Sequence, residues 1–337
     1  MLQLNKEQEQ AVRHRDGPML VLAGPGSGKT AVLTGRIQYL IEAHGVSPEK
    51  ILVLTFSKEA AAEMRERFVR LIGEETNCPV HFGTFHAVFY HILKKQGLYN
   101  ENSILTPNVK REYIYQIGKE LKAPDYQSAG WQDTMLSAIS KVKSGSEADF
   151  PDPKEQELFE RIASAYAEKC RREKKLDFDD MITECIRLLR EIPKVLLKWQ
   201  EKYEYILVDE FQDIDKRQYE VLKLLAGNRR NVFAVGDDDQ SIYGFRGACP
   251  AVLKTFKEDY PELAVVNLTM NYRSCKEIIE EAVRVISHNT DRLPKRQSPF
   301  REEPGEVTTV LFKNAAQESL YVADQIEALL KESLEGD

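Results

Sequence analysis

The chain has 337 residues, of which 42% are hydrophobic and 30% charged, with 14 prolines and 18 glycines. That balance excludes a disordered, collagen-like or low-complexity chain, and the length predicts two or three domains. The net charge of −7 gives no sign of a polyanion partner. No apolar run reaches the ~18 residues of a membrane helix, and the N-terminus is too polar for a secretion signal. We therefore expect a cytoplasmic chain without membrane contact.

The first part of the chain alternates between short apolar runs and helical spacing. Residues 19–22 and 51–54 are continuous apolar runs, typical of strands buried on both faces, and residues 32–43 and 60–72 have the spacing of helices. Strands that alternate with helices indicate a parallel sheet with right-handed crossovers. We predict a doubly wound α/β domain.

Long amphipathic helical stretches then replace this pattern over residues 90–199. They are broken at Pro107, Pro124, residues 143–153 and Pro193. Apolar runs return at residues 205–208 and 231–235, so we expect the first sheet to resume there. The pattern predicts an all-helical domain inserted into the α/β domain.

A last short βα pattern ends the chain. It predicts a helix at residues 276–287, a strand at 307–312 and a helix from 317 to about 334. These elements are too few for a domain, so we interpret them as the incomplete beginning of a second α/β domain and expect a piece of a longer protein. The predicted domains are 1–89 with 200–275, 90–199, and 276–337.

A glycine-rich segment stands between the first predicted strand and helix. It consists of Ala23, Gly24, Pro25, Gly26, Ser27, Gly28, Lys29 and Thr30. Glycines let backbone N–H groups and the helix N-terminus face an anion, while Lys29 reaches terminal phosphates and Thr30 ligates Mg²⁺. The strict pattern begins with glycine, where this chain has Ala23. Strand, loop and helix nevertheless follow in the required order, which predicts a phosphate-binding loop for a nucleotide rather than a glycine-rich turn without nucleotide.

Two acids end another predicted strand. Asp209 follows the apolar run 205–208, where a carboxylate can hold Mg²⁺, and Glu210 is placed to accept a proton from an attacking water. Hydrolysis requires such a base, whereas nucleotide binding alone does not. In isolation an acidic pair is as well explained by helix N-capping. Together with the phosphate loop, it predicts hydrolysis.

Further blocks extend the pattern along the chain. They are Leu4 and Asn5 with Gln8 and Ala11, then residues 54–61, 83–86, 209–213, 235–248 and 271–274. In this order they resemble the superfamily 1 DNA helicases of the UvrD/Rep/PcrA type. The resemblance implies a RecA-like P-loop domain, ATP hydrolysis with Mg²⁺, and 3′ to 5′ movement along single-stranded DNA. Implied partners are single-stranded DNA, junctions with duplex, and other repair or replication proteins.

The resemblance also assigns residues around the nucleotide. Gln8 is implied to read the hydrogen-bonding edge of adenine, and Tyr272 to stack on it. The family often has arginine after the phosphate-loop threonine as the other stacking face, where this chain has Ala31. Gln240 is implied as the sensor between γ-phosphate and DNA, and Arg273 as an arginine finger. Without the resemblance, Arg273 reads as an ordinary surface arginine.

Binding of single-stranded DNA needs aromatic faces for bases and polar or basic groups for phosphates. Four aromatic residues follow predicted strands, at the edge where ligands gather in open parallel sheets: Phe56, Phe85, Tyr243 and Phe245. Phe245 stands where the family commonly has a stacking tryptophan. The alternative is that these rings belong to the core. The backbone contacts are expected from Thr55, Thr84, His86 and Arg246.

A basic run precedes residues 176–181, a segment that also resembles the family. The run contains Lys169, Arg171, Arg172, Lys174 and Lys175. One interpretation is a solvated helix face, and the other is contact with duplex DNA ahead of the motor.

Two later motifs of the family have no counterpart in the chain, and a second arginine finger has no candidate. We therefore predict the ATP-binding and single-stranded-DNA-binding half of a helicase motor. The alternative is a non-motor ATP- and DNA-binding module that needs a partner to complete its ATP site. A P-loop kinase would need an acceptor site and explains neither the Gln240 loop nor the aromatic residues.

Overall fold

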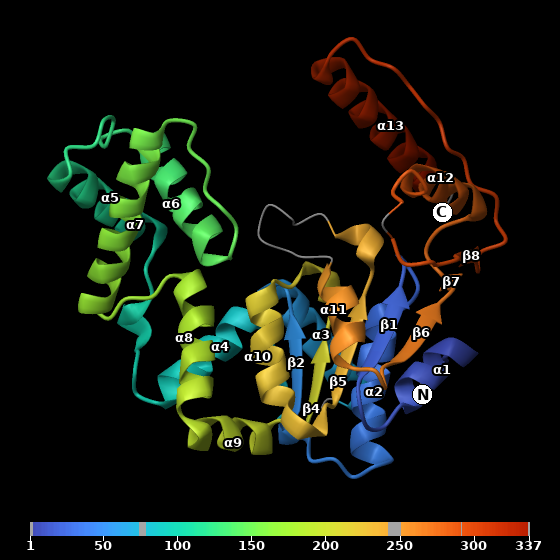
Figure 1. Ribbon diagram of the computed structural model, residues 1–337. Coiled ribbons are helices and arrows are strands. Elements are labelled where there is room, and N and C mark those ends of the chain that lie inside the picture. Colours follow the sequence, from blue (N-terminus) through green and yellow to red (C-terminus); the bar gives the residue numbers. More distant parts are fainter. Residues whose placement is uncertain (1–2, 74–78, 242–250, 291, 336–337) are drawn as a thin grey trace.

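A six-stranded parallel sheet forms the centre of the computed structural model, which describes residues 3–73, 79–241, 251–290 and 292–335 (Figure 1). In spatial order the strands are β3 (His81–Thr84), β2 (Ile51–Thr55), β4 (Tyr205–Val208), β5 (Val232–Gly236), β1 (Met19–Ala23) and β6 (Ala264–Leu268). Every pairing is parallel. The predicted doubly wound α/β fold is confirmed.

Alternate residues of each central strand enter different cores, because successive side chains point to opposite faces of a sheet. Leu20 and Leu22 of β1 belong to one core, whereas Val21 belongs to the other. Both faces are therefore apolar, which explains why the four predicted strands read as unbroken apolar runs. The sequence did not predict β3 and β6, the two edge strands, since both expose part of their side chains.

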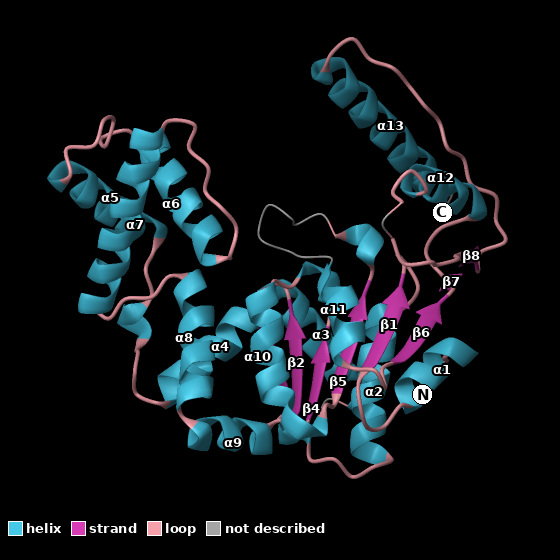
Figure 2. Cartoon of the chain, viewed as in Figure 1, coloured by secondary structure: helices cyan, strands magenta, loops and turns pink. Residues whose placement is uncertain are grey.

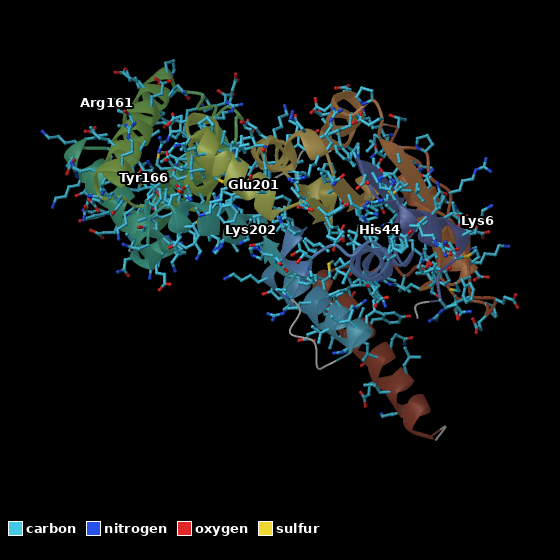
Figure 3. All side chains as sticks on the ribbon, turned by 90° about the horizontal axis from the view of Figure 1, so that it is seen from below. Lys6, His44, Arg161, Tyr166, Glu201 and Lys202 are labelled. Carbon is cyan, nitrogen blue, oxygen red and sulfur yellow. The ribbon has the colours of Figure 1, made fainter. Side chains whose placement is uncertain are left out.

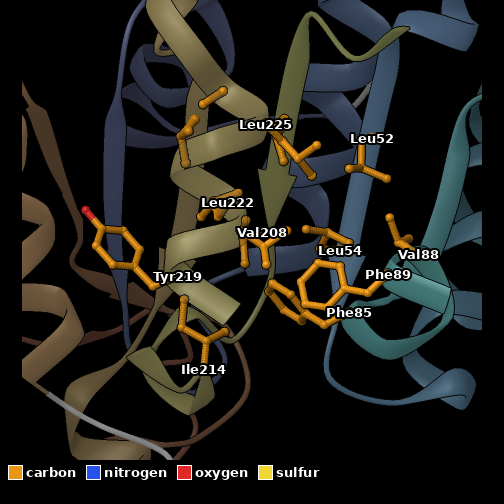
Figure 4. Packing of buried hydrophobic residues seen from close by; sticks show 14 of the residues in the cluster. Leu52, Leu54, Phe85, Val88, Phe89, Val208, Ile214, Tyr219, Leu222 and Leu225 are labelled. Carbon is orange, nitrogen blue, oxygen red and sulfur yellow. The ribbon is translucent and has the colours of Figure 1, made fainter. Parts of the chain in front are cut away.

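Helices cover both faces of the sheet (Figure 2). The helices α1 (Lys6–Arg13), α2 (Lys29–Glu42) and α3 (Lys58–Ile72) contribute to one core. The other core is built with α4 (Phe85–Lys95), α8 (Phe178–Glu191), α9 (Pro193–Lys202), α10 (Lys216–Ala226) and α11 (Ala251–Asp259). Figure 4 shows this second core, where Phe85 and Phe89 of α4 pack beside Leu54 of β2.

Three helices form a separate unit with a core of its own. They are α5 (Pro107–Glu120), α6 (Ala129–Lys143) and α7 (Pro153–Arg172). Pro107 and Pro153 open their helices, because the first helical position needs no backbone N–H. Seen from below, Tyr166 of this unit and Lys6 of α1 lie at opposite ends of the molecule, with Lys202 of α9 between them (Figure 3). The boundaries 90–199 stay a prediction, and the packing of α8 and α9 places their residues against the sheet.

The C-terminal segment extends away from the sheet (Figure 1). It contains β7 (Met270–Asn271), α12 (Lys276–Ile286), β8 (Ser298–Pro299) and α13 (Ala315–Glu335). The strand predicted at residues 307–312 is wrong: the segment has no strand and Leu311 is 94% exposed. A strand needs a hydrogen-bonding neighbour, and the described part of the chain pairs none with it. Among the described helices, none has the length and apolar character to cross a membrane.

Candidate functional site

The polar residues singled out from the sequence converge at one edge of the sheet. The phosphate loop follows β1, Asp209 follows β4, and Asp237 follows β5. These three strands are neighbours in the order β4-β5-β1, so their carboxyl ends meet where open α/β sheets bind ligands. The strand order therefore brings together residues that are far apart in the chain.

Glycine is required at two places in the phosphate loop. Gly28 precedes α2 with φ +86°, a left-handed conformation that other residues adopt only at a cost. At Gly26, a Cβ would lie 2.6 Å from Asn271 Oδ1 and 2.6 Å from Arg273 Cβ, because the loop lies against the end of β7 and the residues that follow it. No side chain caps α2, which leaves its N-terminal end open toward the loop. Backbone N–H groups in this arrangement suit an anion.

Lys29 and Glu210 form an ion pair across the site. The ammonium donates to both carboxylate oxygens at 2.9 Å. Glu210 is held in the left-handed region with φ 49°, ψ 50°, so its backbone turns sharply at the end of β4. The phosphate-binding cation and the candidate base are therefore in direct contact.

Asp209 lies beside this pair with an unsatisfied carboxylate. Its Oδ1 is buried and has no hydrogen-bond partner. Burial, followed by the neighbouring charge of Glu210, raises the pKa of Asp209 to about 6, although Lys29 opposes this shift. An orphaned carboxylate oxygen close to the phosphate loop fits a Mg²⁺ ion, which commonly takes one or two carboxylates together with substrate phosphates. Thr30, the second expected ligand, begins α2 beside Lys29.

A chain of hydrogen bonds joins Glu210 to the loop after β5. Gln212 donates from Nε2 to Glu210 Oε2 at 2.8 Å and accepts at Oε1 from the backbone N–H of Asp237 at 2.9 Å. Gln240 donates from Nε2 to Asp237 Oδ2 at 2.5 Å. The predicted sensor Gln240 is therefore connected to the predicted base Glu210 through two intervening residues.

A cavity of about 510 Å³ opens next to these residues. Its lining consists of Phe56, Ser57, Ala60, Asp209, Glu210, Gln212, Asp213, Asp239 and Gln240. Burial and the charge of Glu210 raise the pKa of Asp213 to about 6, again against the effect of Lys29. The cavity thus places carboxylates, a glutamine and the Phe56 side chain around one space.

Gln8 and Tyr272, the two residues expected to contact adenine, both hydrogen-bond to the phosphate loop. Gln8 is buried and donates from Nε2 to the Ser27 carbonyl at 2.9 Å. Tyr272 donates its backbone N–H to the Gly26 carbonyl at 2.9 Å, and its hydroxyl accepts from Asn5 Nδ2 at 2.9 Å. Ala31 lies in the first turn of α2 and offers no stacking face. Contacts of these residues with adenine stay predictions.

Arg273 is exposed next to the phosphate loop. Its backbone N–H donates to Asn271 Oδ1 at 2.9 Å, and its Cβ is 2.6 Å from the position of a Cβ on Gly26. The exposed side chain is therefore free to approach the space in front of the loop, and its role as an arginine finger stays a prediction.

Three residues expected to bind DNA, Phe85, Thr55 and Thr84, are buried. Phe85 is 2% exposed and packs in the core under the sheet, which corrects its assignment as a stacking residue in favour of the core alternative. Thr55 is fully buried, and its hydroxyl donates to the Ser57 carbonyl at 2.9 Å, so it has no surface for a DNA backbone. Thr84 caps α4 by accepting from the Ala87 N–H at 3.2 Å. Its contact with DNA stays a prediction.

His86 and Phe56 occupy more open positions. The His86 ring lies edge-on to Phe178, with centroids 5.2 Å apart. Phe56 is half-buried and lines the cavity described above. Three further DNA candidates, Tyr243, Phe245 and Arg246, lie outside the described residues.

Part of the basic run of residues 169–175 is engaged inside the helical unit. The Lys169 ammonium lies 4.7 Å from the Tyr113 ring centroid and donates to Gln116 Oε1 at 2.8 Å. Lys175 donates to the Asn102 carbonyl at 2.6 Å. The arrangement favours a helix face over a DNA-binding patch, and a contact with duplex stays a prediction.

Comparison with known proteins agrees with this geometry. A model of the family described as "UvrD/REP helicase N-terminal domain" matches residues 4–261, most of the chain. The chain belongs to the UvrD/REP helicase family. A curated relative, the ATP-dependent DNA helicase PcrA of Staphylococcus epidermidis, is 40% identical over 304 residues, 87% of this chain and 41% of the relative. PcrA of Staphylococcus aureus is 39% identical over 302 residues, with the same coverage. The chain thus spans about two fifths of the length of the relatives it matches.

Three polar residues of this UvrD/REP chain received no role from the sequence. Gln212 and Asp213 belong to the block 209–213, in which the sequence assigned roles to Asp209 and Glu210 alone. Their contact with Glu210 and their place in the cavity lining are seen only in the structure. Lys295 lies far along the chain and reaches the loop after β5. Phe178 was also missed, although its position at the start of a helix and next to a basic run was a usable signal.

Proposed function

We propose that this chain binds and hydrolyses ATP with Mg²⁺ and binds single-stranded DNA, as the ATP-binding part of a 3′ to 5′ DNA helicase. The observation that carries the proposal is the Lys29–Glu210 ion pair beside the orphaned Asp209 oxygen. A structural salt bridge alone does not explain why a second carboxylate, with one buried oxygen that has no hydrogen-bond partner, lies next to it. The direction of movement rests on the family resemblance.

In the proposed reaction each residue has a separate task. The loop N–H groups and Lys29 bind the β- and γ-phosphates, and attraction by the phosphates draws the ammonium away from Glu210. Glu210, released from the ion pair, then accepts the proton of the attacking water. Asp209 and Thr30 would hold Mg²⁺, which supplies charge neutralisation at the phosphates. Gln240 and Arg273 face the developing charge on the γ-phosphoryl group.

We further propose that DNA approaches the side of the molecule where α8 begins. Phe178 is the first residue of α8 and is 55% exposed, which is unusual for so large an apolar ring. The Lys110 ammonium lies 5.8 Å from its centroid and His86 lies on its edge. An exposed aromatic face between two groups that can bind phosphate is the combination that single strands recognise.

Nucleotide binding is tested by calorimetry with Mg²⁺·ATP. We expect Lys29→Ala to weaken binding at least tenfold, because the variant lacks the ammonium that contacts the phosphates. Lys141→Ala, at an exposed lysine of α6 in the helical unit, is the matched control and should bind like the unmodified chain. Equal affinities for Lys29→Ala and the unmodified chain would contradict the proposal.

DNA binding is tested by fluorescence anisotropy with a labelled single strand at two salt concentrations. Phe178→Ala should weaken binding about tenfold at both, because stacking contributes ~1 to 3 kcal/mol per base and depends little on salt. Leu197→Ala removes a comparably exposed apolar side chain from α9 and serves as the control. If both variants lost DNA affinity equally, or if neither variant lost any, the assignment of Phe178 would be contradicted.

A further inference from the structure

A buried lysine from the C-terminal segment pairs with three consecutive acids after β5. Lys295 has a side chain only 6% exposed, and its ammonium contacts Asp237, Asp238 at 2.5 Å and Asp239 at 3.0 Å. Arg292 binds Asp239 through two hydrogen bonds, and the Leu293 N–H donates to Asp238 at 2.6 Å. We call residues 292–295 together with Asp237, Asp238 and Asp239 the acid clasp.

The clasp compensates charges that would otherwise oppose one another. Asp237 is 1% exposed, and its two neighbours are at most 14% exposed at the side chain. Three carboxylates this close repel one another in a poorly solvated place, and an unpaired buried charge is costly. Lys295 and Arg292 supply the positive charges that compensate these carboxylates. Burial lowers the pKa of Lys295, but its hydrogen bonds with Asp237 and Asp238 outweigh that effect and keep the ammonium charged.

The first of these acids, Asp237, accepts the hydrogen bonds that shape the turn before Gln240. The backbone N–H of Gln240 donates to the Asp237 carbonyl at 3.0 Å, and the N–H of Asp239 donates to Asp237 Oδ1 at 3.2 Å. The Gln240 side chain donates to Asp237 Oδ2. Asp237 thus organises the turn with its carbonyl and both carboxylate oxygens while Lys295 neutralises it. The position of Gln240 depends on a carboxylate whose charge is compensated from another part of the chain.

We propose that Lys295 is a positioning residue for Gln240 and so links the C-terminal segment to the γ-phosphate end of the nucleotide site. Three hydrogen bonds lead from Lys295 to the candidate base: Lys295 to Asp237, Asp237 to Gln212, and Gln212 to Glu210. Lys295 itself touches neither the phosphate loop nor its lysine in these contacts. We therefore expect its effect on Gln240 and Glu210, which the proposed function places at the γ-phosphate that ADP lacks. This inference rests on the proposed function.

The first test measures the turn itself, without nucleotide. Hydrogen exchange of the Asp239 and Gln240 amides should accelerate about tenfold in Lys295→Met, because the acids repel one another and the turn opens. Amides of β4 and β5 in the same sample should keep their protection, which shows that the variant is folded. Lys313→Met, at an exposed lysine of the same C-terminal segment, should leave the turn unchanged. Unchanged exchange at Asp239 and Gln240 in Lys295→Met would overturn the proposal.

The second test measures discrimination between nucleotides by calorimetry. Lys295→Met should bind a non-hydrolysable ATP analogue about tenfold more weakly, while its affinity for ADP stays within about twofold. Lys295→Arg keeps the charge and should recover most of the affinity for the analogue. A purely structural role would weaken both nucleotides equally, and that result would overturn the proposal. If the unmodified chain itself binds neither nucleotide, the proposed function fails and the sensing role with it, whatever the exchange experiment shows.

Discussion

Glu210 forms an ion pair with Lys29, which must move away before Glu210 can act as a base in the proposed reaction. Both of its carboxylate oxygens accept from Lys29 in the structure, whereas the proposed reaction needs one of them to accept a proton from water. The proposed reaction requires the Lys29 ammonium to exchange this ion pair for phosphate contacts when nucleotide binds. Glu210 itself is in the left-handed region directly after β4.

At the residue scale, the Glu210→Gln variant should separate ATP binding from ATP hydrolysis. The amide cannot accept the proton of the attacking water, so we expect phosphate release to fall at least 10²-fold. Binding of Mg²⁺·ATP should stay within about threefold, since the phosphate loop and Asp209 are unchanged. Phosphate release and calorimetry on the same preparation measure the two effects. Undiminished release would remove Glu210 from the reaction.

The lowered pKa of His81 leads to a second prediction at the residue scale. Burial, assisted by the charges of Lys202 and His91, lowers its pKa from 6.5 to about 4. The unfolded chain therefore takes up a proton on His81 more readily, and the free energy of unfolding falls as the pH drops from about 6.5 toward 4. Because solvent reaches part of the ring, we expect a loss of about 1 kcal/mol between pH 7 and pH 5. Urea denaturation should show a smaller loss for His81→Gln, and equal losses would contradict the assignment.

Residues next to a strong local pattern were predictable, and residues defined by distant contacts were not. The phosphate loop and Asp209 directly follow apolar runs, so the strand order alone places them at one edge. The role proposed for Lys295 follows only from its contacts with three acids, of which Asp237 lies 58 positions earlier in the chain. Phe85 was misassigned because an aromatic after a strand points either to the edge or into the core, and only burial decides between them.

At the scale of elements, an ionic network joins the helical unit to the sheet. Arg217 of α10 donates to the Lys143 carbonyl of α6 at 2.8 Å and to Asp179 of α8 at 2.8 Å. Lys143 in turn binds Asp177 and Asp180. Residues of α6, α8 and α10 therefore meet in one network of largely buried charged side chains.

Removal of Arg217 should loosen this junction. Its side chain is 15% exposed, and Arg217→Met leaves Asp179 and Asp215 without their cation. We expect the free energy of unfolding to fall by about 3 kcal/mol, the size typical of an uncompensated buried charge. Arg172→Met, at an exposed arginine, should change it by less than about 0.5 kcal/mol. Similar values for the two variants in urea denaturation would show that the network does not stabilise the junction.

Strands that are buried on both faces could be predicted from the sequence, whereas partly exposed strands could not. The strands β1, β2, β4 and β5 are apolar on both faces, and each was predicted within a residue or two of its bounds. The edge strand β6 alternates between exposed and buried residues and escaped notice. The strand predicted at 307–312 fails for the opposite reason, because its residues have a strand-like composition but no neighbour among the described residues.

At the scale of the whole molecule, we expect the 337-residue chain to hydrolyse ATP slowly and to unwind no duplex by itself. An arginine finger from another domain contributes ~10³ to 10⁵ in turnover, and the sequence offers no candidate for the second one. Phosphate release with single-stranded DNA should rise when a polypeptide with the later motifs is added. Glu210→Gln in the same assay excludes a contaminating enzyme. Robust unwinding by the purified chain would contradict this expectation.

The strand order also decides when the nucleotide site becomes available during synthesis. β1 carries the phosphate loop, yet its Met19 pairs only with Phe233 of β5 and Ala264 of β6. At about 5 to 20 residues per second, a ribosome needs roughly 10 to 50 s to reach these partners after β1 has been made. Throughout that interval the wholly apolar run Met19–Ala23 lacks the strands with which it pairs in the folded structure, and unpaired apolar segments of this kind are prone to aggregate. We therefore expect nascent chains that end before β5 to depend on chaperones and to be unable to bind ATP.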